Sequence, residues 1–297
     1  MVPACYGLGD ALRRLARSGV EQARGIRAFA DGCRLGHLAS CGKLGRAYAA
    51  GKHIARDVKK ARMLYEKACE GGVWVACNDA ALGYRSGKDG FPKDRSRALN
   101  LLSRACGGRH YPACVRLGAA YSAVRGARSY ERARSLFQSA CDAEHFPGCS
   151  ALGDLYARER TGFRDLTKAK TLYSKACEGG SLRGCVQLGN AYVDGAGVTR
   201  DAKRGASLFR RSCMAGEMRG CSRLGLLFAY GDGVGKRPDE AAKFYAKACD
   251  GRYGEGCFFL GLAYQAGKGL LKDRAKAKRF FRRACKLGYS RGCREGR

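Results

Sequence analysis

Cysteine is the residue type whose spacing in this sequence could do chemistry, because a thiol can form a disulfide, bind a metal or act as a nucleophile. The 297-residue chain has 17 cysteines, and all but Cys5 fall into eight pairs with the spacing C-x7-C. Successive pairs begin 35 to 37 residues apart, a period typical of stacked-repeat proteins. The pairs are Cys33 with Cys41, Cys69 with Cys77, Cys106 with Cys114, Cys141 with Cys149, Cys177 with Cys185, Cys213 with Cys221, Cys249 with Cys257 and Cys285 with Cys293.

The spacing inside each pair is constant, whereas the spacing between pairs varies by one residue. An open loop tolerates such variation, but two groups that must meet in space do not, so the pattern favours a disulfide within each pair. Two alternatives stay open. Free cysteines could pack as small apolar residues, or zinc could be bound, for which C-x2-C spacing or accompanying histidines are typical. The four histidines (His37, His53, His110 and His145) follow no repeat, so we expect no metal and no other cofactor.

Nucleophilic chemistry at a serine would need a base within hydrogen-bonding reach. The one match to the S-x-x-K motif of serine β-lactamases is Ser40-Cys41-Gly42-Lys43, and the companion S-D-N and K-T-G motifs are absent from the sequence. We therefore assign no catalytic residue, and regard the match at Ser40 as coincidental.

Between the cysteine pairs, apolar residues recur with helical spacing. In a typical unit, Leu188, Gly189 and Tyr192 predict a first helix that ends in a glycine turn at Gly195. The Leu-Gly step recurs, and we expect the partner helix to approach closely at its glycine. The second helix carries an apolar stripe, as in Ala169, Leu172, Tyr173 and Ala176. Before it stands an aspartate suited to cap the helix, at Asp57, Asp94, Asp165, Asp201, Asp239 and Asp273.

The second helix also has a basic residue two positions before its cysteine in six units: Lys67, Arg104, Lys175, Arg211, Lys247 and Arg283. Stacked repeats would align these cations in a positive column. Alternatively, each cation complements the dipole at the end of its own helix.

The formal net charge of +31 predicts attraction to anionic partners such as nucleic acid, acidic proteins or an anionic surface. The basic residues are spread along the chain, which is equally consistent with solvated helix faces. No apolar stretch is long enough to span a membrane, and the given chain shows no signal peptide.

The recurring pattern L-G-x-x-Y, glycine turn, D-x-x-K-A, Y-x-K-A-C, G-x-x-x-G-C resembles the Sel-1-like repeat family in its cysteine-rich, Helicobacter-type bacterial form. The stretches Asp57–Cys77 and Asp165–Cys185 match it most closely. The resemblance implies an all-α, right-handed α/α superhelix of about eight helix-turn-helix repeats of ~36 residues, cross-linked by the C-x7-C disulfides. It also implies a secreted or periplasmic adaptor. Some cysteine-rich members are described as penicillin-binding proteins with weak β-lactamase activity, but no catalytic motif of theirs can be matched here.

We expect residues 1–297 to form a single solenoid. Cys5 has the sequence context of a second pair member, so the chain is expected to begin inside a repeat, truncated at its N-terminus, which leaves Cys5 as an odd thiol. The expected units are roughly 5–40, 41–76, 77–113, 114–148, 149–184, 185–220, 221–256 and 257–292.

The functional hypothesis is a non-catalytic scaffold that binds proteins or peptides outside the reducing cytosol, because solenoids expose long binding surfaces and disulfides persist in oxidising compartments. One alternative is a β-lactam-binding or β-lactam-hydrolysing protein, by resemblance. Another is a polyanion binder that uses the basic surface. The candidate ligand-facing residues of the first helices are Arg46, Arg116, Asp154, Asn190 and Arg223.

Overall fold

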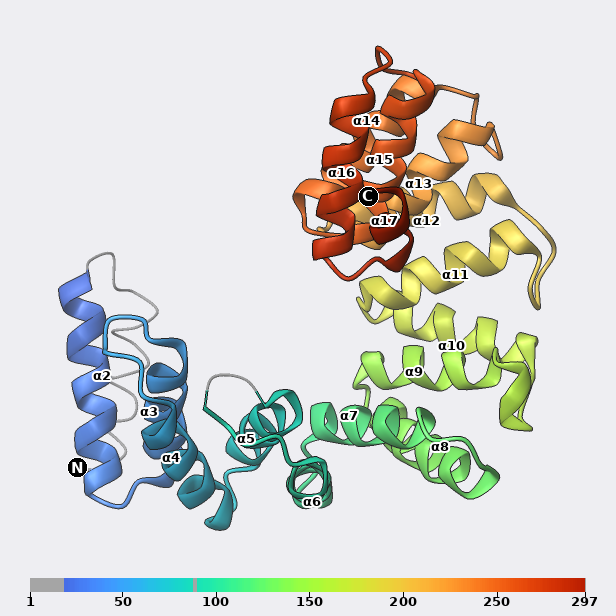
Figure 1. Cartoon of the computed structure of the whole chain (residues 1–297). Helices are drawn as coiled ribbons and strands as arrows, with labels where there is room; N and C mark the ends of the chain where they lie inside the picture. Colours follow the sequence, from blue (N-terminus) through green and yellow to red (C-terminus); the bar gives the residue numbers. More distant parts are fainter. Residues whose placement is uncertain (1–18, 88–89, 297) are drawn as a thin grey trace. The chain divides into compact units, whose positions relative to one another are not determined.

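A computed structural model of the protein describes residues 19–87 and 90–296 (Figure 1). These residues form sixteen α-helices and one 3-10 helix, without a β-strand among them. Cys5 lies outside the described residues. The helices are α2 (Gly19–Arg34), α3 (Leu38–Ala50), α4 (Val58–Glu70), α5 (Trp74–Ser86), α6 (Arg95–Gly107), α7 (Tyr111–Ser122), α8 (Ala127–Asp142), α9 (Phe146–Tyr156), η1 (Glu159–Thr161), α10 (Leu166–Glu178), α11 (Leu182–Asp194), α12 (Ala202–Met214), α13 (Met218–Tyr230), α14 (Pro238–Asp250), α15 (Gly254–Ala266), α16 (Arg274–Lys286) and α17 (Ser290–Glu295).

The helices alternate between the two kinds that the sequence predicts. The A helices that contain the Leu-Gly step or its equivalent are α3, α5, α7, α9, α11, α13 and α15. The short α17, which carries the second cysteine of the last pair, has the place of an A helix. The B helices, which end near the first cysteine of a pair, are α2, α4, α6, α8, α10, α12, α14 and α16. The described chain is therefore a series of helix-turn-helix repeats, as expected.

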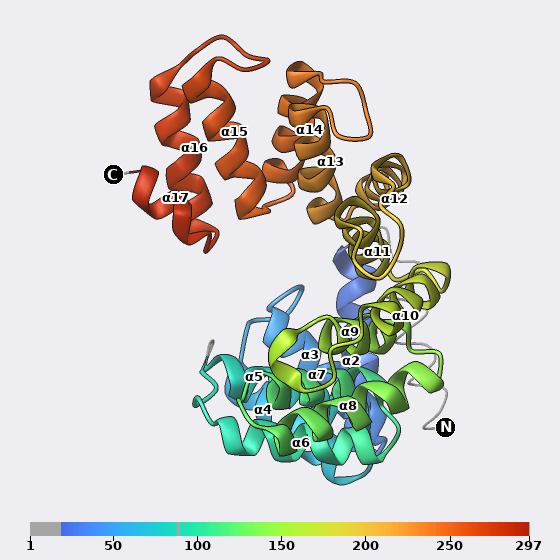
Figure 2. The ribbon, with the colours of Figure 1, turned by 90° about the vertical axis from the view of Figure 1, so that its right-hand side faces the viewer.

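The described residues divide into two compact units, with the boundary between Ser139 and Ala140 near the end of α8. The first unit contains α2 to α7 and most of α8, around a core that includes Phe29, Leu44 and Tyr84. The second contains α9 to α17, and its largest core includes Phe209 and Phe228. Within the second unit, consecutive helices such as α13 and α14, or α15 and α16, lie side by side (Figures 1 and 2). The single array over residues 1–297 stays a prediction.

The glycine of the Leu-Gly step allows the A and B helices to pack closely, as expected. A methyl group built on Gly189 would lie 2.6 Å from the ring of Phe209, and one on Gly225 would lie 2.6 Å from the ring of Tyr245. Both rings are buried. Side chains larger than hydrogen at these positions would displace a core aromatic ring, so the glycine favours close packing of the helix pair.

The glycine turns and the aspartate caps lie where the sequence predicts them, with one exception among the caps. Gly195, which follows α11, has φ +71° and donates its N–H to the carbonyl oxygen of Ala191, a conformation that glycine adopts without strain. Asp165 accepts a hydrogen bond of 2.9 Å from the backbone N–H of Lys168, which caps α10. Asp57, Asp94, Asp201 and Asp273 cap their helices in the same way. Asp239 instead lies in the first turn of α14, where Arg237 occupies the capping position.

All eight C-x7-C pairs are disulfide-bonded, with Cα–Cα distances of 4.4 to 4.7 Å. The two alternatives, free thiols and a zinc site, therefore do not apply to these sixteen cysteines. The bonds join Cys33 with Cys41, Cys69 with Cys77, Cys106 with Cys114, Cys141 with Cys149, Cys177 with Cys185, Cys213 with Cys221, Cys249 with Cys257 and Cys285 with Cys293.

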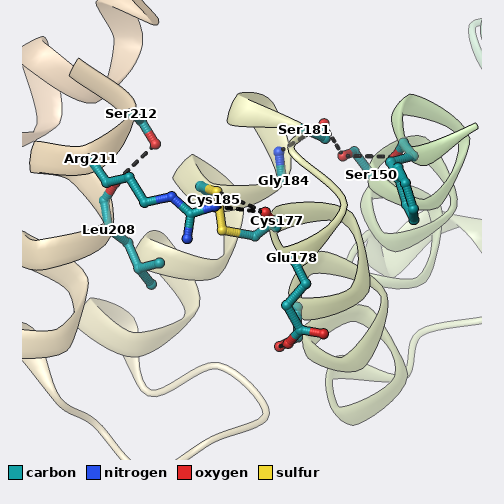
Figure 3. The surroundings of a disulfide bond; sticks show 11 residues. Ser150, Cys177, Glu178, Ser181, Gly184, Cys185, Leu208, Arg211 and Ser212 are labelled. Carbon is teal, nitrogen blue, oxygen red and sulfur yellow. Dashed lines mark hydrogen bonds between the residues drawn. A yellow bond between two sulfur atoms is a disulfide. The ribbon is translucent and has the colours of Figure 1, made fainter. Parts of the chain in front are cut away.

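Each bond joins the end of a B helix to the following A helix, as Cys177 of α10 and Cys185 of α11 illustrate (Figure 3). The close approach leaves little room for a side chain between the two helices. A methyl group on Gly184 would lie 2.6 Å from that of Ala176. The disulfides therefore fix the turn that links one repeat to the next.

Candidate functional site

The surface of the A helices is predicted to face a ligand. In the structure, charged residues on this surface contact one another across neighbouring repeats. Arg46 of α3 donates a hydrogen bond of 3.0 Å from Nε to Asp79 of α5, and its terminal nitrogen also pairs with that carboxylate. The hydrogen bond and the ion pair with Asp79 raise the pKa of Arg46 against the opposing effect of burial, which is the largest single influence. Arg46 is therefore held by the next repeat.

Asp154 of α9 is the centre of a larger polar network. It accepts hydrogen bonds from the hydroxyl of Tyr173 at 3.0 Å and from Nε2 of Gln187 at 2.6 Å, and it forms an ion pair with Arg183. Burial raises the pKa of Tyr173, and the neighbouring Asp154 carboxylate raises it further. Asn190 of α11 joins the network through a hydrogen bond of 3.1 Å to Gln187.

The other two predicted residues also contact neighbouring repeats. Arg116 of α7 donates to the side-chain oxygen of Asn78 in α5 at 3.2 Å. Arg223 of α13 lies 3.7 Å from the carboxylate of Glu255 in α15, and its buried Nε has no hydrogen-bond partner within the described part of the protein. The structure thus places the five residues on A helices. Asp154 and Asn190 share one network through Gln187, whereas Arg46, Arg116 and Arg223 make separate contacts with neighbouring repeats. Their assignment to a ligand face stays a prediction.

Two of these contacts share one register, in which the residue after the Leu-Gly step meets the residue 33 positions later. Arg46 meets Asp79 in this way, and Asp154 meets Gln187. In α13 and α15 the corresponding positions are Leu226 and Phe259, and both are apolar. At this one register position a partly exposed apolar pair takes the place of the polar contact, while Arg223 and Glu255 still join α13 and α15.

Leu226 and Phe259 line a cleft of about 510 Å³ between α13 and α15. Its floor is formed by α14, where the Tyr245 ring stacks on Phe259 with a centroid distance of 5.3 Å. Burial raises the pKa of Tyr245, and the nearby Tyr230 and Glu255 raise it further. The remaining lining residues are Ala229, Tyr230, Lys236, Pro238, Ala241, Leu262, Ala263, Gln265, Ala266 and Lys268.

The rim of the cleft combines one exposed aromatic ring with two cations. The Tyr230 side chain is 78% exposed, an unusual placement for a large ring. Lys236 and Lys268 are also exposed, and none of the described residues that line the cleft is acidic. An apolar side chain could therefore enter, while a carboxylate beside it would be attracted to the lysines. We take this cleft, which the sequence analysis missed, as the candidate functional site.

Ser40 has the surroundings of a structural residue. It is fully buried, and its hydroxyl lies 2.8 Å from Nδ1 of His37, the residue that precedes α3. A buried hydroxyl offers no path for a substrate carbonyl.

Among the described residues, no group of three or more His, Cys, Asp or Glu side chains is placed to hold a metal ion. None of the described helices is long and apolar enough to cross a membrane.

Comparison with known proteins agrees with this architecture. The profile of the Sel1 repeat family matches the chain at residues 38–73, 74–108, 112–145, 147–181, 182–217, 219–253 and 254–289. A protective antigen of uropathogenic Escherichia coli with this fold is 25% identical and superposes with a TM-score of 0.65, covering 90% of this chain and 57% of that one. The Helicobacter pylori cysteine-rich protein B is 33% identical over 44% of this chain and 93% of its own, with a TM-score of 0.37.

Among curated proteins, mouse cytochrome c oxidase assembly factor 7 is 33% identical over 135 residues. The match covers 43% of this chain and 56% of the mouse protein. The chain thus spans about half the length of this relative.

Proposed function

Because the chain belongs to the Sel1 repeat family, we propose that it is a protein-binding scaffold whose cleft between α13 and α15 receives an apolar segment of a partner protein. The observation that carries this proposal is that Leu226 and Phe259, at the register position where Arg46 meets Asp79, form a partly exposed apolar pair that lines the cleft. Binding is favourable when a partner buries apolar side chains that the cleft leaves partly exposed to water.

The partner segment should combine an apolar or aromatic anchor with neighbouring carboxylates. Tyr230 offers an exposed ring against which the anchor can pack, and Lys236 and Lys268 supply the positive rim. The overall charge of +31 favours encounter with an acidic partner. The mouse relative is named as an assembly factor, and a role in holding other proteins is in keeping with that name.

The eight disulfides support a location outside the reducing cytosol, periplasmic or secreted, since such bonds persist in oxidising compartments. The partner should therefore be sought among proteins of the same compartment. The β-lactam hypothesis gains no support from Ser40, which is buried against His37.

Selection from a random peptide library tests the cleft directly. Peptides enriched on the wild-type protein should share an apolar anchor flanked by Asp or Glu, and Leu262→Glu should weaken their binding at least tenfold. The matched control is Met63→Glu, which places the same charge on an exposed apolar residue of α4 in the other unit. Peptides that bind wild type and Leu262→Glu equally well would overturn the assignment.

A further inference from the structure

The surface of α16 differs from that of the other described B helices in the number of its cations, because none of the others has more than four. Its sequence, RAKAKRFFRRACK, has seven cations and no acidic residue. Lys276 pairs with Asp273 and Arg283 with Asp250. The other five cations have no carboxylate partner among the described residues. They are Arg274, Lys278, Arg279, Arg282 and Lys286, all exposed, and they form the cationic face of α16.

A comparison with α14, the preceding B helix, shows how unusual this face is. Lys278 stands 36 residues after Ala242, which is buried with 2% of its surface exposed. Arg282 corresponds to the half-buried Ala246, and Lys286 to Asp250. Helix α16 thus carries cations where α14 has small or acidic residues. A surface that only needed to be soluble would mix both signs of charge.

Two further features accompany the cations. The side chains of Lys278, Arg279, Arg282, Arg283 and Lys286 line an open surface hollow of about 660 Å³ along α16. Leu271 lies three residues before Arg274, in the turn between α15 and α16, and is 91% exposed. Helices α15 and α16 lie side by side at this end of the unit (Figure 2).

We propose that the cationic face of α16, together with Leu271, docks the protein on a membrane surface rich in anionic lipid headgroups. Clustered Lys and Arg side chains bind such headgroups, and a neighbouring apolar side chain enters the interface. Nucleic acid fits the same charges less well. Stacking of single-stranded bases would require exposed aromatic rings, whereas Phe280 and Tyr289 are partly buried against the core of the unit. Duplex DNA offers no apolar interface for the exposed Leu271 to enter. This inference is independent of the cleft between α13 and α15.

Co-sedimentation with vesicles tests the proposal. The full chain is mixed with vesicles of neutral phosphatidylcholine, or of phosphatidylcholine with 30% phosphatidylglycerol, at 0.15 M salt. Binding to the anionic vesicles should exceed binding to the neutral ones at least tenfold. Lys278→Gln/Arg279→Gln should lower it by about 25-fold, since each cation contributes about fivefold near such a surface. The control Arg95→Gln/Arg128→Gln removes two exposed cations elsewhere and should lower it less than threefold.

Leu271→Ser distinguishes a membrane from other polyanions. It should weaken binding to anionic vesicles about fivefold and leave binding to duplex DNA unchanged. Equal binding to neutral and anionic vesicles would overturn the proposal, as would equal losses in the α16 variant and the control. A Leu271→Ser variant that binds vesicles like wild type, with tighter binding of the wild type to DNA, would assign the face to nucleic acid instead.

Discussion

The guanidinium of Arg211 in α12 donates a hydrogen bond of 3.0 Å to the carbonyl oxygen of Cys177, the cysteine near the end of α10 (Figure 3). Arg283 makes the same contact with Cys249, also at 3.0 Å. The basic residues before the cysteines thus do not all point into solvent as a column. At these two positions, the cation donates a hydrogen bond to a carbonyl group at the end of the preceding B helix. Its charge also interacts favourably with the negative end of that helix's dipole.

The first prediction concerns this contact. Arg211→Gln should destabilise the second unit by about 1 kcal/mol, because it removes a hydrogen bond to a helix end that remains partly solvated. Lys175→Gln is the matched control, since Lys175 has the same place in its repeat but makes no such bond to Cys141 within the described chain. Guanidinium unfolding followed by circular dichroism measures both changes. Equal effects would show that the position matters only through its charge.

The second prediction concerns the packing of A against B helices. Gly189→Ala should lower stability by about 1–3 kcal/mol, because the added methyl group would overlap the buried Phe209 ring. This loss should exceed the gain of up to ~1 kcal/mol in helix propensity. Gly107→Ala is the control. Nothing lies within 4 Å of the methyl group that it would add to α6, so it should leave stability unchanged or raise it. The thermal midpoints of the two variants should therefore move in opposite directions, or only that of Gly189→Ala should fall.

A third prediction concerns the order in which the disulfides are reduced. Both cysteines of the bond between Cys285 and Cys293 are partly exposed, whereas Cys177 and Cys185 are buried with 3% and 0% of their surface exposed. In dilute dithiothreitol without denaturant, the bond between Cys285 and Cys293 should therefore be reduced first, because thiol attack requires access. Alkylation followed by peptide mapping reads the order. Simultaneous reduction of the two bonds would mean that global unfolding controls the reaction.

The fourth prediction concerns acid. The backbone N–H groups from which Asp57, Asp165 and Asp273 accept hydrogen bonds lower the pKa of each carboxyl below its ordinary value of 3.8. A lowered pKa in the folded state stabilises the protein above pH 3.8, and this contribution is lost as pH falls through the folded-state pKa. The triple variant with Asn at these positions keeps the caps without their titration. Its thermal midpoint should depend less steeply on pH between 5 and 2 than that of wild type.

The sequence predicted the features that depend on neighbours along the chain. The cysteine pairs, the aspartate caps and the Leu-Gly contacts all join residues within one repeat or one turn, so the period reveals them. The Arg46–Asp79 pair and the Leu226–Phe259 surface depend instead on the register between successive A helices. The repeat period alone does not fix that register. Apolar residues at helical spacing are all predicted to be buried, and only the packing of the helices shows which of them stay partly exposed.

The disulfides also determine how the protein would respond to a pulling force. Each bond closes a short local loop, and none of the eight links repeats that are distant in the chain. Force applied at the two ends would bypass every loop and extend only the stretches between bonds, such as the 28 residues from Cys185 to Cys213. Each extended stretch would add about 95 Å of contour length. The covalent pattern thus sets a mechanical unit of one repeat, and reduction would lengthen that unit.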